Sequence, residues 1–152
     1  MGVTLRDGGP DPAMTEAEGG CHCGAVRFRV RLADGLRTAR RCTCSFCRMK
    51  GTVAVTVADG GFTLISGESL RDYRFNTGTA RHWFCGICGI PTHHARRSVP
   101  GQLAVNAACL DGASPFDFLD LPVMDGEAHP ADSGVSREAG RLRYSPDRKS
   151  VV

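Results

Sequence analysis

The chain has 152 residues, of which 41% are hydrophobic, and its formal net charge at pH 7 is +3. This length and composition suit one domain with an ordinary core. No apolar run approaches the roughly 18 residues that a membrane-spanning helix needs, and so small a charge does not by itself indicate nucleic-acid binding.

The first 18 residues are polar and contain Gly9, Pro10 and Pro12. They lack the apolar segment and the small-residue cleavage site of a signal peptide. We therefore expect residues 1–18 to form a disordered extension and the protein to be cytoplasmic.

Apolar and polar residues alternate with period 2 along much of the remaining chain, a pattern that predicts half-buried β-strands. In chain order, strands are expected at 26–30, 53–57, 62–65, 70–75, 81–84 and 102–106. The turn sequence SGES at 66–69 predicts that the third and fourth strands form a hairpin. Single helical turns are expected at 45–50 and 115–119. The fold class predicted is therefore a mainly β, loop-rich domain.

This domain is expected to span residues 19–130. Residues 131–152 are polar and form the predicted C-terminal tail, which could hold one short strand at 142–144.

Seven of the eight cysteines fall into short-spaced groups. The groups are Cys21 and Cys23, then Cys42, Cys44 and Cys47, then Cys85 and Cys88, with Cys109 alone. In a chain without an export signal, this clustering favours metal or thiol chemistry over disulfides.

Cys85 and Cys88, followed by Gly89, have the spacing of a zinc knuckle. Two thiolates fill only half of a tetrahedral zinc site, and Cys21 and Cys23 would supply the other half. The alternative is a redox dithiol, which needs a βαβ context that this sequence does not offer. The four cysteines thus predict a structural zinc site.

Cys42, Cys44 and Cys47 supply three thiolates within one loop. The fourth position could belong to a distant side chain, water, a substrate or nothing. Three protein ligands with an exchangeable position are typical of a catalytic zinc, and a three-thiolate zinc suits another thiolate as its soft fourth ligand.

The distant side chains that could fill that position are Cys109, His82, His93, His94 and His129. Cys109 lies in an apolar segment and is expected to be a small buried side chain. Each histidine is expected to be structural or solvent-facing. Three neighbouring arginines (Arg40, Arg41 and Arg48) could attract an anionic thiol, although a solvated surface is an equally good interpretation.

Three segments, "GGCHCGAVRFRV", "CTCSFCRMKG" and "RHWFCGICGIPTHHARRS", resemble in order and spacing the glutathione-dependent formaldehyde-activating enzyme family, whose domain is shared with centromere protein V. The resemblance covers residues 19–130. It implies a β-tent-like (Mss4-like) fold, in which short antiparallel sheets are joined by zinc-binding cysteine loops.

The resemblance also implies two Zn²⁺ ions per chain. A structural zinc would be held by Cys21, Cys23, Cys85 and Cys88, and a catalytic zinc by Cys42, Cys44 and Cys47. The implied activity is a carbon–sulfur lyase reaction, the condensation of formaldehyde with glutathione to S-hydroxymethylglutathione. Arg96 and Arg97 are hypothesised to bind glutathione carboxylates, and His93 either forms a hydrogen bond near the site or packs in the core.

Two other functions remain open at this stage. One is a non-catalytic zinc module that binds a protein or a nucleic acid, as the centromere relatives suggest. The aromatic content of 7% and the small charge argue against nucleic acid. The other is a thiol or metal sensor built on the three-cysteine group. The sequence gives no oligomeric state.

Overall fold

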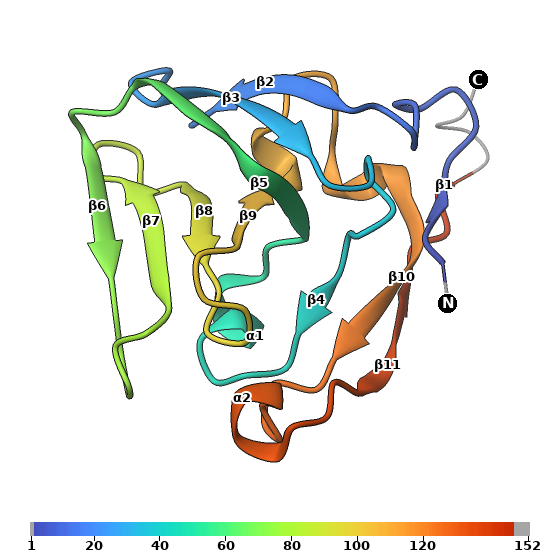
Figure 1. The fold of residues 1–152 in the computed structure, drawn as a ribbon. Coiled ribbons are helices and arrows are strands. Elements are labelled where there is room, and N and C mark those ends of the chain that lie inside the picture. Colours follow the sequence, from blue (N-terminus) through green and yellow to red (C-terminus); the bar gives the residue numbers. More distant parts are fainter. Residues whose placement is uncertain (1, 148–152) are drawn as a thin grey trace.

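The structure, a computed structural model, describes residues 2–147 as two β-sheets with short helical turns between strands (Figure 1). The strands are β1 (Thr4–Leu5), β2 (Glu16–Gly20), β3 (Arg27–Leu32), β4 (Arg41–Cys42), β5 (Ala54–Ser66), β6 (Leu70–Tyr73), β7 (Arg81–Cys85), β8 (Pro91–Ala95), β9 (Leu103–Asn106), β10 (Phe118–Met124) and β11 (Glu138–Arg143). The helical turns are α1 (Cys47–Lys50), η1 (Ala107–Cys109), η2 (Pro115–Asp117) and α2 (Pro130–Ser133).

The prediction of a mainly β domain is confirmed, and α1 and η2 fall within the two expected helical turns. None of the helices in residues 2–147 is long and apolar enough to cross a membrane.

Seven strands form the larger sheet in the order β2-β3-β5-β9-β8-β7-β6, with every neighbouring pair antiparallel. The long strand β5 joins the two halves of this sheet because it changes partner along its length. Residues 54–56 pair with β9, whereas residues 57–66 pair with β3. The ribbon of β5 accordingly runs across the upper part of the molecule in Figure 1.

The alternation in β3 positions the core. Phe28, Val30 and Leu32 are buried, whereas Arg29 and Arg31 between them are exposed. Fully burying an apolar side chain of this size contributes about 1.5–3 kcal/mol, so one face of β3 stabilises the domain while the other stays in water. The strand predicted at 26–30 is confirmed, displaced by about one residue.

His93 packs in the core rather than at a site. Its ring stacks on Phe62 at 4.2 Å and on Trp83 at 4.6 Å between ring centroids, and its Nδ1 lies 2.8 Å from the Thr92 hydroxyl. Burial lowers the pKa of His93 to about 4, so the ring is neutral at pH 7. The packing role is thus the one that the structure shows.

The hairpin predicted between residues 62–65 and 70–75 is wrong. The end of β5 pairs with β3, with Leu64 opposite Phe28, and β6 pairs with β7, with Leu70 opposite Cys85. The turn at 66–69 instead connects β5, which lies beside β3, with β6, which is the edge strand at the far end of the sheet. There the Ser69 carbonyl accepts a hydrogen bond of 2.7 Å from the Gly86 N–H.

The smaller sheet contains β1, β10 and β11, with β4 running parallel to β10. The disorder predicted for residues 1–18 is not found in residues 2–18, because Leu5 of β1 pairs with Phe118 of β10 and β2 begins at Glu16. The few apolar residues of this polar segment, among them Met14, pack against the core and hold it in place.

The chain after Pro130 also belongs to the fold. β11 pairs with β10 along its length, so the short strand predicted at 142–144 exists but begins at Glu138 and ends at Arg143. Strands thus lie on both sides of the expected limits 19 and 130. Met1 and residues 148–152, which belong to the predicted extension and tail, lie outside the described residues.

Candidate metal centres

Two groups of cysteines could hold a metal ion among the described residues. The first comprises Cys21, Cys23, Cys85 and Cys88, whose sulfur atoms all lie within 4.8 Å of one another. β2 and β7, which lead into the two pairs, are separated by four strands in the sheet order, so the sheet must curl to bring the pairs together. This group joins the two ends of the larger sheet.

The spacing of these sulfurs fits a tetrahedral ion. Cys21 Sγ lies 3.6 Å from Cys23 Sγ, which lies 3.7 Å from Cys85 Sγ. Zinc–sulfur bonds of about 2.3 Å place the corners of a tetrahedron about 3.8 Å apart. Hydrogen bonds from the backbone N–H of Val26 to Cys21 and of Ile87 to Cys85 stabilise negative charge on the sulfurs.

One thiol of this group, that of Cys85, loses its proton more easily than a free thiol. The Ser69 hydroxyl beside Cys85 lowers the pKa of that thiol to about 6. After Cys88 the chain turns at Gly89 into β8, and no helix follows, so the βαβ surroundings of a redox dithiol are absent here. These four residues could therefore form a closed, structural metal site.

The second group comprises Cys42, Cys44 and Cys47, again with all sulfurs within 4.8 Å. Within residues 2–147, no other His, Cys, Asp or Glu atom lies within that distance of all three sulfurs. Cys42 ends β4, and Cys47 begins α1, so the three thiols occupy one tight turn. The N–H groups of Cys44 and Cys47 point at the sulfurs of Cys42 and Cys44, at 3.4 and 3.3 Å.

The thiols of this turn do not titrate alike. The thiols of Cys42 and Cys47 stabilise a thiolate at Cys44 by hydrogen bonding and hold the pKa of Cys44 well below its usual range. The same closeness to Cys42 and Cys44, with burial, raises the pKa of Cys47. Three thiols this close together share their protons by hydrogen bonding, and a cation could take the place of those protons.

β10 and the residues that follow it hold the three-cysteine turn in place by hydrogen bonds. β4 runs parallel to β10, and the Thr43 N–H donates to the Met124 carbonyl at 3.1 Å. The Gly126 N–H then donates to the Thr43 hydroxyl at 3.0 Å, which brings Gly126 against the cysteines. β10 therefore supports the three-cysteine turn although it is distant in sequence.

Gly126→Ala should disrupt this group selectively. A Cβ on Gly126 would meet Cys42 Sγ and lie 2.8 Å from both the Cβ and the N of Cys44, closer than real Cβ contacts come. We expect the variant to fold, keep the first metal and lose most of the second, as measured by metal analysis of the purified protein. Gly140→Ala is the matched control, because nothing lies within 4 Å of the added Cβ. Equal metal content in the two variants would contradict this packing.

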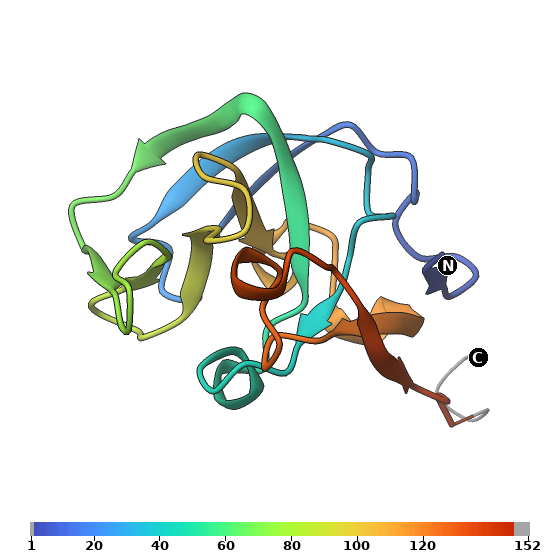
Figure 2. The ribbon, with the colours of Figure 1, turned by 60° about the horizontal axis from the view of Figure 1, so that its bottom comes forward.

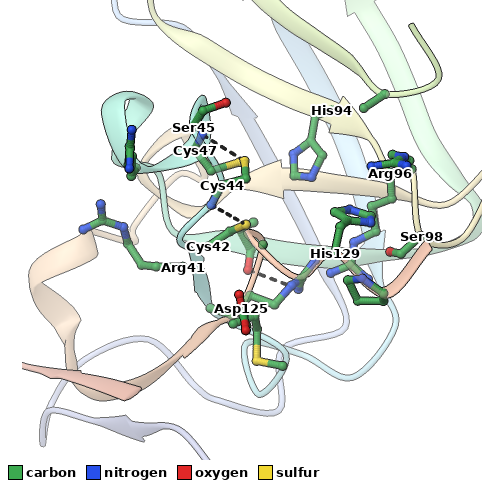
Figure 3. A pocket seen from close by; sticks show the side chains of 18 of the residues that line it. Arg41, Cys42, Cys44, Ser45, Cys47, His94, Arg96, Ser98, Asp125 and His129 are labelled. Carbon is green, nitrogen blue, oxygen red and sulfur yellow. Dashed lines mark hydrogen bonds between the residues drawn. The ribbon is translucent and has the colours of Figure 1, made fainter. Parts of the chain in front are cut away.

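The second group faces a cavity of about 750 Å³, a size typical of small-molecule sites. α1, β4 and α2 all contribute to its lining, and Figure 2 shows α1 and α2 on the same side of the molecule. In the close view of Figure 3, His94 and Arg96 lie across from the three cysteines. Asp125 and His129 lie below them in that view, and both line the cavity.

The predicted cationic residues have different surroundings. Arg96 and Arg97 both line the cavity. Arg97 pairs with Asp132, whereas Arg96 donates to Gln102 Oε1 at 2.6 Å and has no carboxylate partner among the described residues. Burial lowers the pKa of Arg96 to about 10, which leaves it charged at pH 7.

The three arginines beside the turn also differ from one another. Arg40 donates hydrogen bonds to the Thr38 carbonyl at 2.9 Å and to the Thr56 hydroxyl at 3.1 Å. Arg48 is exposed. Arg41 Nε is buried without a hydrogen-bond partner in the described part of the chain.

Lys50 of the cavity was not singled out from the sequence, and His82 and His94 were considered only as possible ligands of the three-cysteine group. Lys50 Nζ lies 3.2 Å from His82 Nδ1, and the rings of His82 and His94 stack at 5.2 Å. The two histidines are opposite one another in the β7–β8 pair. Only recognition of β8 as a strand could have revealed this pairing, and the 91–95 segment shows no clear alternation.

Cys109 belongs to neither group. It is buried at 5% exposure, and its thiol lies 3.3 Å from the Pro91 carbonyl oxygen. The prediction that Cys109 is a small buried side chain is confirmed.

The fold and these two groups define a class: a mainly β protein with one four-cysteine and one three-cysteine metal-type cluster. The model of the glutathione-dependent formaldehyde-activating enzyme family matches residues 16–118, and the chain belongs to that family. The resemblance seen in the three cysteine segments is thereby confirmed.

Two individual proteins are similar to parts of this chain. A Halomonas elongata protein that carries the provisional name of a glutathione-dependent formaldehyde-activating enzyme is 43% identical over 53 residues, which are 34% of this chain and 29% of the relative. The aligned part thus spans less than a third of that relative. A crystal structure of a Rhodobacter sphaeroides protein is 50% identical with a TM-score of 0.64, covering 66% of this chain and 93% of the other.

Proposed function

We propose that the protein is a zinc-dependent carbon–sulfur lyase, which adds formaldehyde to the thiol of glutathione or a similar small thiol and catalyses the reverse cleavage. One observation carries this proposal. Three sulfurs within 4.8 Å of one another face a cavity of about 750 Å³, and no fourth ligand from the described residues joins them.

Each cysteine group fits a different use of zinc. The four-cysteine group would hold a structural ion with all four positions taken by protein, and the three-cysteine group would hold an ion open to one further ligand. When bound there, zinc would lower the pKa of a substrate thiol and so supply the thiolate nucleophile. Thiolates persist in a reducing compartment, which is consistent with the proposed cytoplasmic location.

The cavity offers a place for the rest of the thiol substrate. Arg96 lies at the side of the cavity across from the cysteines in Figure 3 and has no carboxylate partner among residues 2–147. A guanidinium in this state matches a substrate carboxylate, which it can bind in a bidentate way. Arg97 is already paired with Asp132, so we assign one carboxylate of glutathione to Arg96 before Arg97.

The proposed reaction requires the cavity to hold the thiol and the formaldehyde side by side. The cysteine turn, β8 and the segment after β10 all contribute side chains to the lining of the cavity. A thiolate held on one wall can attack the carbonyl carbon of a formaldehyde molecule trapped beside it, so that a C–S bond forms and the carbonyl π bond becomes an alkoxide. Protonation of that alkoxide gives the S-hydroxymethyl product.

The test is an exchange measurement, because formaldehyde and glutathione also react without a catalyst. Two-dimensional NMR exchange spectroscopy on an equilibrium mixture gives the rate of interconversion between glutathione and its S-hydroxymethyl adduct. We expect the zinc-loaded protein to raise this rate in proportion to its concentration. Protein alkylated with iodoacetamide serves as the control.

An exchange rate that equals the background at every protein concentration would contradict the lyase proposal. A zinc module or a thiol sensor would give that result. Glutathione replaced by free cysteine or by a carboxylate-free thiol then measures how far the substrate extends beyond glutathione.

A further inference from the structure

We propose that His94 is the group that moves the proton in this reaction, accepting it from the substrate thiol and returning it to the alkoxide oxygen. The inference rests on the proposed lyase function and adds a catalytic residue to it.

The position of His94 supports this role. It lies on β8 and lines the same cavity as the three cysteines and Arg96. Figure 3 shows its ring extending into the cavity, between the cysteines on one side and Arg96 on the other. A thiol substrate that spans from the cysteines to Arg96 would therefore pass beside the imidazole.

The hydrogen bonding of His94 differs from that of its two neighbours. His93 is engaged with the Thr92 hydroxyl at 2.8 Å, and His82 with the Lys50 ammonium at 3.2 Å. The His94 ring makes no hydrogen bond with any residue from 2 to 147, and its recorded ring contact is the stack on His82. Its nitrogens thus remain available to a ligand.

The surroundings of His94 keep the ring neutral before reaction. Burial, then the charge of Lys50 on α1, then His82 on β7 and the adjacent His93 lower its pKa, while the sulfur of Cys44 raises it. The neutral ring has one unprotonated nitrogen that can accept a proton, and the negative charge that forms on the substrate sulfur offsets the low pKa during the transfer. Its conjugate acid, destabilised by the same surroundings, returns that proton readily.

His94 is not placed as a metal ligand. Its nitrogens fall outside the set of atoms that lie within 4.8 Å of one another around Cys42, Cys44 and Cys47. The ring and Cys44 line the same cavity, and the charge of Cys44 raises the pKa of His94.

The step balances without a further reactant. The thiol S–H proton moves to an imidazole nitrogen, the sulfur lone pair forms the C–S bond, and the carbonyl π pair moves to oxygen. The imidazolium then donates its proton to that oxygen and returns to the neutral state. Cleavage of the adduct follows the same path in reverse.

The test combines His94→Gln and His94→Ala with the exchange measurement. We expect both variants to keep two zinc ions and the glutathione affinity of the wild type, measured by metal analysis and calorimetry. General acid–base catalysis contributes about 10²–10⁴-fold, so the protein-dependent exchange rate should fall by at least about 100-fold. Added imidazole should restore part of the rate in His94→Ala. His22→Gln, which removes an exposed imidazole, is the control.

Each other outcome overturns the inference. An exchange rate within a few-fold of wild type in both variants, or no restoration by imidazole, would exclude proton transfer by His94. Loss of the second zinc, or a changed cobalt spectrum before thiol is added, would make His94 a ligand instead. In all these cases the wild type still accelerates exchange, whereas a wild type without activity would overturn the lyase proposal itself.

Discussion

Replacing Cys85 by serine is expected to unfold the protein. Cys85 is fully buried, and its sulfur belongs to the group that joins residues 21–23 to residues 85–88 across the curled sheet. Structural zinc contributes on the order of 10 kcal/mol in zinc-finger peptides, which is comparable to the 5–15 kcal/mol by which a whole domain is stable. Removing one of four ligands should therefore remove most of the stability.

Circular dichroism and size-exclusion chromatography of Cys85→Ser measure this loss. Cys109→Ala is the matched control, because Cys109 is also buried but belongs to neither cysteine group. The control should fold and lose about 1–2 kcal/mol, the usual cost of a small cavity. If Cys85→Ser melted within a few degrees of Cys109→Ala, the first group would not be a structural metal site.

Replacing Cys44 by serine is expected to leave the fold intact and to abolish the protein-dependent exchange rate. The second group lies within one turn from Cys42 to Cys47, so its metal links no distant parts of the chain. The zinc content should fall from two per chain to one. The exchange rate of the glutathione adduct should fall to its uncatalysed background.

Metal analysis, thermal melting and the exchange measurement on the same sample separate the possible results. Unfolding of Cys44→Ser to the same extent as Cys85→Ser would show that the second group is structural. Full activity with a single bound zinc would place the reaction elsewhere. Cys109→Ala again provides the control for substitution of a cysteine.

Local patterns in the sequence were sufficient for much of this structure. The alternation around Phe28 predicted β3, and the spacing of the seven clustered cysteines predicted both metal-type groups. In the three-cysteine group the ligands lie within six positions, so proximity follows from chain length alone. The pairing of Cys21 and Cys23 with Cys85 and Cys88 followed from the need of a tetrahedral ion for four ligands.

Features that depend on long-range register were not predictable in this way. The turn at Gly67 has a hairpin-like sequence, yet the strands on its two sides pair with β3 and β7 because the sheet curls. β10, which contains Pro122, was not expected from the sequence. The packing of Gly126 on the cysteines depends on β10 and was therefore not expected either. The position of His94 in the cavity depends on the β7–β8 pairing, which places His94 opposite His82. No local pattern in the sequence predicts that register.

The central claim is that the three-cysteine group holds a metal with one position open to a thiol. Titration of glutathione into cobalt-substituted protein tests it most directly, because thiolate-to-cobalt charge-transfer bands report each sulfur that binds. We expect these bands to grow and saturate at millimolar glutathione, and to stay unchanged with S-methylglutathione, which has no thiol, and in Cys44→Ser. A wild-type spectrum that does not change with glutathione would contradict the account.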